Sequence, residues 1–125
     1  MPKVSKASAA KQQDIGVGHV SEEVVEGYEI SFLDIHEASD MAPFLKGLPD
    51  DRCPLPHWGY VVKGRVTFSF ADHTETFETG DAFYVAPGHS PAVDAATEWL
   101  IFSPAEQSAE VNAVIERNVQ EMQSA

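Results

Sequence analysis

Between residues 57 and 102, short segments of β-branched and aromatic residues alternate with turn residues at intervals of about 8–12 positions. This spacing constrains the fold most strongly, because it leaves each strand only a few residues long. The turn residues are, in order, Lys63-Gly64, Asp72-His73, Thr79-Gly80 and Pro87-Gly88. We expect Lys63-Gly64 to close a hairpin between residues 60–62 and 65–70. Many short strands with such turns predict an all-β sandwich or small barrel.

The region before these strands predicts one further strand and a long loop. We expect residues 28–37 to form a strand with one mostly apolar face. Residues 38–56 contain residues that prevent regular structure over most of the segment, namely Pro43, Gly47, Pro49, Pro54 and Pro56. A loop this long inside a domain is usually functional or disordered. The full length of 125 residues fits a single domain.

The two ends of the chain differ from the barrel region. Residues 1–23 lack periodic hydrophobicity, so we expect a flexible or edge-pairing arm, with order beginning near Val24 and a barrel over residues 24–104. After Ser103-Pro104 the apolar residues follow helical spacing, which predicts a helix over residues 105–125. The apolar stripe of this helix consists of Val111, Val114, Ile115, Val119 and Met122. Such a stripe would cover the barrel or meet a second subunit.

The charge of the chain disfavours several classes of partner. With 20 acidic and 8 basic residues, the formal net charge is -12. Nucleic acid and anionic membrane surfaces would be repelled by this charge. Residues 1–13 contain no apolar stretch of the kind a secretory signal needs. The single cysteine, Cys53, excludes an internal disulfide and is usual in a reducing compartment, so we expect a cytoplasmic protein.

Two segments, residues 56–68 and 78–91, resemble the two halves of the cupin motif. The first contains a Tyr-Val-Val-x-Gly sequence ending at Gly64, and the second contains Gly80-Asp81 followed by Pro87-Gly88. The resemblance implies an antiparallel double-stranded β-helix, a jelly-roll barrel, here followed by a C-terminal α-helix. We expect Gly64 and Gly80 to adopt positive φ at the turns.

The resemblance also implies a metal site, and this chain departs from the usual ligand pattern. The two positions of the cupin His-x-His pair are Asp51 and Cys53, and the glutamate position is His57. The last histidine position is Pro91, but His89 lies two residues earlier, on the same face of a strand. Cys53, His57 and His89, with Asp51 as a further candidate, form a set that suits zinc, nickel or iron.

Each candidate also has an alternative interpretation. His57 could bond the backbone or the carboxylates of Asp50 and Asp51, His89 could satisfy the backbone of its turn, and a single buried cysteine is usually an inert core residue. Glu98 is a candidate catalytic carboxylate if Glu98, Leu100 and Phe102 face inward. Otherwise Glu98 is a solvated residue at the end of a strand.

The first functional hypothesis is a small single-domain cupin that binds a small molecule in the barrel. In one form of this hypothesis, the small molecule binds through a divalent metal. If the site is catalytic, the resemblance implies a metal-dependent oxygenase or isomerase, with His57 and Glu98 as catalytic candidates. The alternative is a metal-free, non-catalytic ligand-binding or sensing barrel. A third class is a metal-independent proton-transfer enzyme using His57 and a carboxylate. We also expect a homodimer, formed through the N-terminal segment or the terminal helix.

Overall fold

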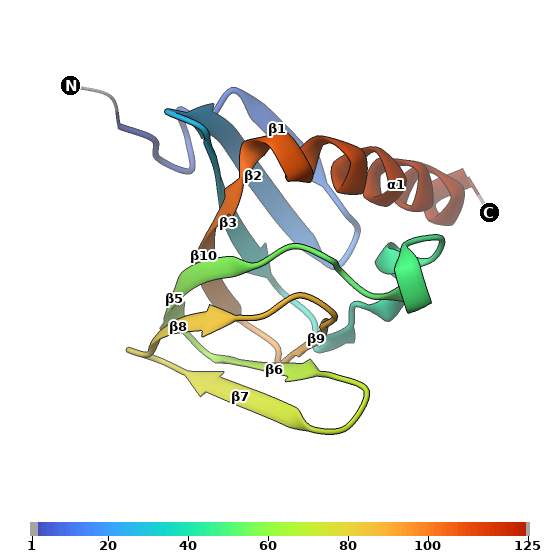
Figure 1. Ribbon diagram of the computed structural model, residues 1–125. Helices are drawn as coiled ribbons and strands as arrows, with labels where there is room; N and C mark the ends of the chain where they lie inside the picture. Colours follow the sequence, from blue (N-terminus) through green and yellow to red (C-terminus); the bar gives the residue numbers. More distant parts are fainter. Residues whose placement is uncertain (1–2, 125) are drawn as a thin grey trace.

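The computed structural model describes residues 3–124. Within that range, two antiparallel sheets form a barrel with one long helix packed beside it (Figure 1). The larger sheet has the order β1 (Lys11–Asp14), β2 (Gly18–Val25), β3 (Tyr28–Ile35), β10 (Thr97–Pro104), β5 (His57–Lys63) and β8 (Ala82–Val85). The smaller sheet has the order β4 (Ser39–Asp40), β9 (Ser90–Val93), β6 (Arg65–Ser69) and β7 (Thr74–Glu78). The expected all-β barrel with a C-terminal helix is confirmed.

The chain changes sheets at Gly64, so the expected hairpin there is wrong. β5 pairs with β10 and β8, whereas β6 pairs with β7 and β9. The positive φ is confirmed at both Gly64 (100°) and Gly80 (90°). The Gly64 amide donates to Thr79 Oγ1 over 2.9 Å, and the Gly80 amide donates to the Val61 carbonyl over 2.9 Å. Two corners that bond to each other therefore replace two independent tight turns.

Gly64 is also sterically required at its corner. A Cβ atom there would lie 2.2 Å from Thr97 Oγ1 and 2.8 Å from Thr97 Cα, whereas a Cβ on Gly80 would meet nothing within 4 Å. The Asp72-His73 turn does join paired neighbours, because β6 and β7 form a hairpin. Local turn signals thus located the corners correctly, but pairing between distant strands decided which turns are hairpins.

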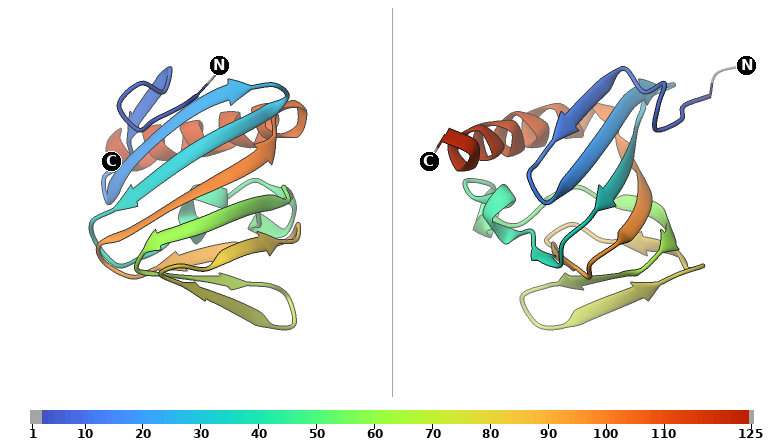
Figure 2. Two further views of the ribbon diagram at one scale, coloured as in Figure 1. Left: turned by 90° about the vertical axis from the view of Figure 1, so that its left-hand side faces the viewer. Right: turned by 180° about the vertical axis from the view of Figure 1, so that it is seen from behind.

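Order begins earlier than the expected start near Val24. β1 and β2 pair with each other, and β2 also pairs with β3, which makes β1 an edge strand of the larger sheet (Figure 2). Polar residues within β2, such as the buried Ser21 and the cavity-lining Glu22, conceal its strand character in the sequence, while Ile15 is buried in the core. Residues 1 and 2 of the expected arm and residue 125 of the expected helix lie outside the described residues.

The helix α1 (Ala105–Ser124) packs on its own barrel. Val111 and Val119 are buried, whereas Met122 is exposed, so the buried part of the apolar stripe ends before Met122. Asn118 Nδ2 donates to the Phe44 carbonyl over 2.7 Å, which ties the helix to η1 (Ala42–Leu45) in the proline-rich loop. Among residues 3–124, no helix is long and apolar enough to cross a bilayer.

Candidate metal centre and pocket

Cys53, His57 and His89 come from three segments that meet inside the barrel. Cys53 follows η2 (Pro49–Asp51), His57 is the first residue of β5, and His89 immediately precedes β9. The Cys53 amide donates to the His89 carbonyl over 2.8 Å, and the Gly88 amide donates to the Cys53 carbonyl over 2.8 Å. Main-chain hydrogen bonds therefore hold the cysteine and histidine segments together before any side chain contributes.

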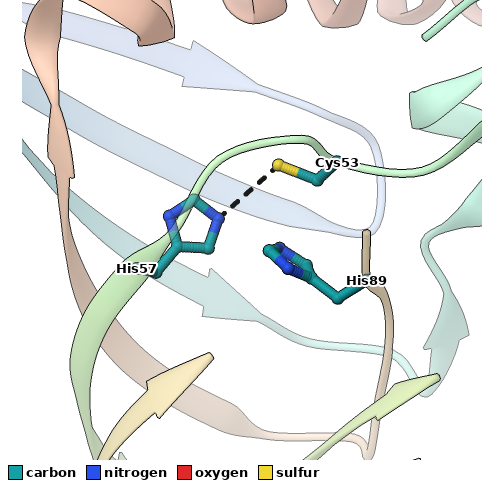
Figure 3. Close-up of side chains that lie close together, drawn as sticks. All are labelled: Cys53, His57 and His89. Carbon is teal, nitrogen blue, oxygen red and sulfur yellow. Dashed lines mark hydrogen bonds between the residues drawn. The ribbon is translucent and has the colours of Figure 1, made fainter. Parts of the chain in front are cut away.

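The three side chains converge on one point (Figure 3). Their potential ligand atoms all lie within 4.8 Å of one another, and Cys53 Sγ lies 3.6 Å from His57 Nε2. The His57 and His89 rings meet edge to face, with centroids 4.8 Å apart. All three residues are buried, and His89 is only 1% exposed. The structure thus brings together three of the four ligand candidates found in the sequence.

Hydrogen bonds on the far side of each ring fix which nitrogen faces the cluster. His89 Nδ1 lies 2.7 Å from the Ala86 carbonyl, which accepts only, so Nδ1 carries the proton and Nε2 the lone pair. His57 Nδ1 lies 2.8 Å from Ser103 Oγ, and with Nδ1 donating to that hydroxyl, His57 Nε2 directs its lone pair at Cys53. Both imidazoles are therefore oriented to donate lone pairs to a shared centre.

Burial makes all three groups neutral. Burial, with a smaller contribution from His89, lowers the pKa of His57 from 6.5 to about 3. Burial also lowers the pKa of His89 and raises the pKa of Cys53 from 9.0 to about 11. A thiol with such a high pKa opposite a neutral imidazole is not an activated nucleophile. Neutral imidazoles, however, are the form that ligates a metal, and a bound metal deprotonates a thiol.

The donor set fits a divalent metal. Tetrahedral zinc with nitrogen at about 2.0 Å and sulfur at about 2.3 Å places its ligand atoms roughly 3.3–3.7 Å apart. The 3.6 Å between Cys53 Sγ and His57 Nε2 falls in this range. The longer separations, of up to 4.8 Å, involve the ligand atom of His89, so His89 would move by about 1 Å to complete the site. Three protein ligands leave a coordination position for a small molecule.

The other two candidates lie elsewhere. Asp51 is exposed, and its Oδ1 accepts the Gly47 amide over 3.0 Å, so this carboxylate caps a turn of the loop instead of joining the cluster. Glu98 bonds Lys6 Nζ over 3.0 Å on the outer face of β10. The inward residues of that strand are the alternate set of Thr97, Trp99, Ile101 and Ser103. Glu98 therefore points away from the pocket, in agreement with its alternative interpretation as a solvated strand residue.

A cavity of about 140 Å³ extends from the cluster between the larger sheet and α1. Its walls are largely apolar and include Leu33, Trp99 and Ile101. The sequence did not reveal the polar part of this lining, which includes Glu22, Glu29, Ser103 and Asn112. Glu29 alternates with Ser31 and Leu33 along its strand, and this pattern could have marked it as inward-facing.

A jelly-roll barrel with inward-facing imidazoles at its centre defines a cupin architecture, and the chain has the cupin fold. It is similar to an RmlC-like cupin from Shewanella frigidimarina NCIMB 400, with a TM-score of 0.53 and 16% identity over 78% of this chain and 86% of that one. The polyketide cyclase RemF from Streptomyces resistomycificus gives a TM-score of 0.56 and 14% identity over 83% and 79% of the two chains.

A third similar structure contains a metal. Streptomyces albus HEPD, with Fe(II) and its substrate 2-hydroxyethylphosphonate bound, gives a TM-score of 0.50 and 17% identity over 70% of this chain and 21% of that one. No protein-family model and no curated protein matches the sequence. At these identities the similarity establishes the fold, and the site has to be interpreted from its own residues.

Proposed function

We propose that this chain is a small-molecule-binding cupin whose divalent metal is held by Cys53, His57 and His89. The observation that carries the proposal is the convergence of three neutral donor groups, within 4.8 Å, at a cavity with apolar walls. HEPD, which has a similar fold, binds Fe(II) with its substrate, and this supports iron beside zinc and nickel as candidates.

The residues around the centre have separate roles in this function. A metal held by Cys53, His57 and His89 would supply Lewis acidity or, if it is iron(II), a capacity for chemistry with dioxygen. Ser103 holds the His57 ring through Nδ1 and so fixes Nε2 as the ligating atom. Trp99 and Ile101 exclude water from the pocket and provide the surface on which an apolar ligand packs.

The test is a thermal melt of the protein with zinc, nickel or iron(II), compared with chelator. A metal that binds only the folded state stabilises it by about 2.7 kcal/mol at a hundredfold excess over Kd. The wild type should melt at a higher temperature with metal, and the His57→Ala/His89→Ala variant should not. His73→Ala, which removes an exposed histidine, is the matched control and should retain the shift. A metal shift that persists in the double variant contradicts the assignment.

A metal-free binding barrel is the second candidate function, and one contact favours it. The Cys53 thiol can donate to His57 Nε2 over 3.6 Å, which satisfies both groups without a metal. In that function the histidines contact an organic ligand directly. The same melts discriminate the two functions, because the metal-free barrel gives no metal-dependent shift in any of the proteins.

A further inference from the structure

A pair of carboxyl groups, one buried and one half-buried, lies at another part of the same pocket. Glu22 on β2 and Glu29 on β3 both line the cavity, and Glu29 is only 8% exposed. Glu29 Oε2 accepts Asn112 Nδ2 of α1 over 2.6 Å, and Glu22 Oε2 accepts the Ser31 hydroxyl over 3.1 Å. Neutral donors therefore hold each carboxyl group at the cavity, and the two lie close enough for Glu22 to raise the pKa of Glu29.

Among residues 3–124, Glu29 forms no direct ion pair, and the more distant Lys11 offsets its charge only in part. Lys11 on β1 lies 3.9 Å from Glu22 Oε1 and pairs with Glu116 of α1. Burial, followed by repulsion from Glu22, raises the pKa of Glu29 from 4.5 to about 7. Because a buried charge is costly without a counter-charge, the pair retains a proton near neutral pH.

The carboxyl pair and the candidate metal centre lie on one face of the larger sheet. Glu29 pairs in register with Ser103 on the neighbouring strand β10. The Ser103 hydroxyl in turn bonds His57 Nδ1 over 2.8 Å. Glu29 on β3 and His57 on β5 therefore lie on either side of β10, and both line the same cavity.

We propose that Glu22 and Glu29 together bind the ammonium group of a small primary amine whose apolar body fills the pocket. An ammonium group has three N–H donors and a positive charge, so it can replace the shared proton and bridge two carboxylates. The extension of that amine toward Cys53, His57 and His89 rests on the proposed function. Binding at the carboxyl pair does not require a metal.

The cavity volume limits the size of the amine. An apolar cavity of about 150 Å³ accommodates benzene. The volume of about 140 Å³ here therefore suits a body of about one six-membered ring. Benzylamine is a suitable probe, and benzyl alcohol and benzoate match its size while changing the charge of the polar group.

The experiment is calorimetric titration of chelator-treated protein at pH 6.5 with each probe. We expect benzylamine to bind at least tenfold more tightly than benzyl alcohol, and benzoate to bind more weakly than either. Because the ammonium replaces a proton, benzylamine should release protons, detected as a dependence of the heat on the ionisation enthalpy of the buffer. Glu29→Gln should lose both the preference and the proton release, whereas exposed Glu110→Gln should keep both.

Other outcomes overturn the proposal. Equal affinities for benzylamine and benzyl alcohol, a preference for benzoate, or no binding of any probe each contradict it. So does a Glu29→Gln variant that keeps the amine preference. Glu22→Gln provides a second variant if Glu29→Gln does not fold, and it should weaken benzylamine binding in the same direction. If the wild type binds benzylamine as expected but shows no metal-dependent melting shift, the metal centre alone is refuted. If the wild type shows the metal-dependent shift but no preference for benzylamine, the amine site alone is refuted.

Discussion

The cluster of Cys53, His57 and His89 and the pair of Glu22 and Glu29 line one pocket, yet burial moves their proton affinities in opposite directions. His57 has its pKa lowered to about 3, while Glu29 has its pKa raised to about 7. The cause is the same, because burial favours whichever protonation state is uncharged.

The comparison shows how one largely apolar pocket can hold both a set of metal-ligand candidates and a pair of carboxyl groups. Near neutral pH burial keeps the imidazoles uncharged and keeps a proton on Glu29, and each group prefers a cation when it binds. The imidazoles donate lone pairs to a metal, while the carboxyl pair exchanges a proton for an ammonium group. The following variants change a member of one of the two groups or a residue that contacts it.

The largest effect is expected from acid on His57. The unfolded chain binds a proton at a pKa near 6.5 and the folded chain only near 3, so stability falls as pH drops through this window. The shift corresponds to roughly 3–5 kcal/mol. Urea unfolding with chelator at pH 7 and 3.5 should show a smaller loss for His57→Gln than for wild type. His36→Gln, an exposed control, should lose as much as wild type, and equal losses in all three proteins would refute this pKa shift.

Ser103→Ala should weaken metal binding without affecting the carboxyl pair. Loss of the hydroxyl frees the His57 ring, and removal of such a partner costs about 10–100-fold in metal affinity, or about 1.4–2.7 kcal/mol. Competition with a chromophoric chelator measures this affinity. Ser103→Thr should restore most of it, because threonine keeps the hydroxyl. An affinity unchanged in Ser103→Ala would show that the ring is held by packing alone.

Glu29→Gln should change the pH dependence of stability in the direction opposite to His57. The folded pKa is raised, so the contribution of Glu29 is fully present below pH 4.5 and is lost as pH rises toward about 7. Allowing for solvent screening, we expect the stability of Glu29→Gln relative to wild type to increase by about 1–2 kcal/mol between pH 4.5 and 8. Urea unfolding at pH 4.5, 6 and 8 measures it, and a constant difference would contradict the prediction.

The smallest effect is expected at the ion pair between Lys11 and Glu116, which lines the pocket beside the carboxyl groups. Both side chains are substantially exposed, so Lys11→Met should cost only about 0.2–1 kcal/mol. High salt should reduce the difference from wild type. A larger loss in thermal melts would show that Lys11 also neutralises Glu22 in the folded protein.

Local sequence signals predicted much of the fold. Glycines at the corners and alternating strands were sufficient to predict a barrel, and both glycines do have positive φ. The hairpin predicted at Gly64 was wrong, because a turn between two β segments has the same local pattern whether the strands pair with each other or enter different sheets. The sequence also failed to predict β2, whose charged residues resemble those of a loop.

The site was predictable to the extent that its residues share a motif. Cys53, His57 and His89 lie at or beside positions that the cupin resemblance marks, and the structure brings them together. Glu29 and Asn112 lie 83 residues apart and come from a strand and a helix outside that motif. Their contact depends on how α1 lies over the sheet, which no local pattern encodes.

The main-chain bridge between Cys53 and His89 also has a kinetic consequence. The two residues come from distant segments, and such contacts form only after the intervening chain has closed. The centre should therefore be assembled near the end of folding, when the two sheets have met. A coloured ion such as nickel, added during refolding, would report this final closure separately from the earlier gain of secondary structure. Once bound, it would link segments that must separate for the barrel to open, and so would slow unfolding.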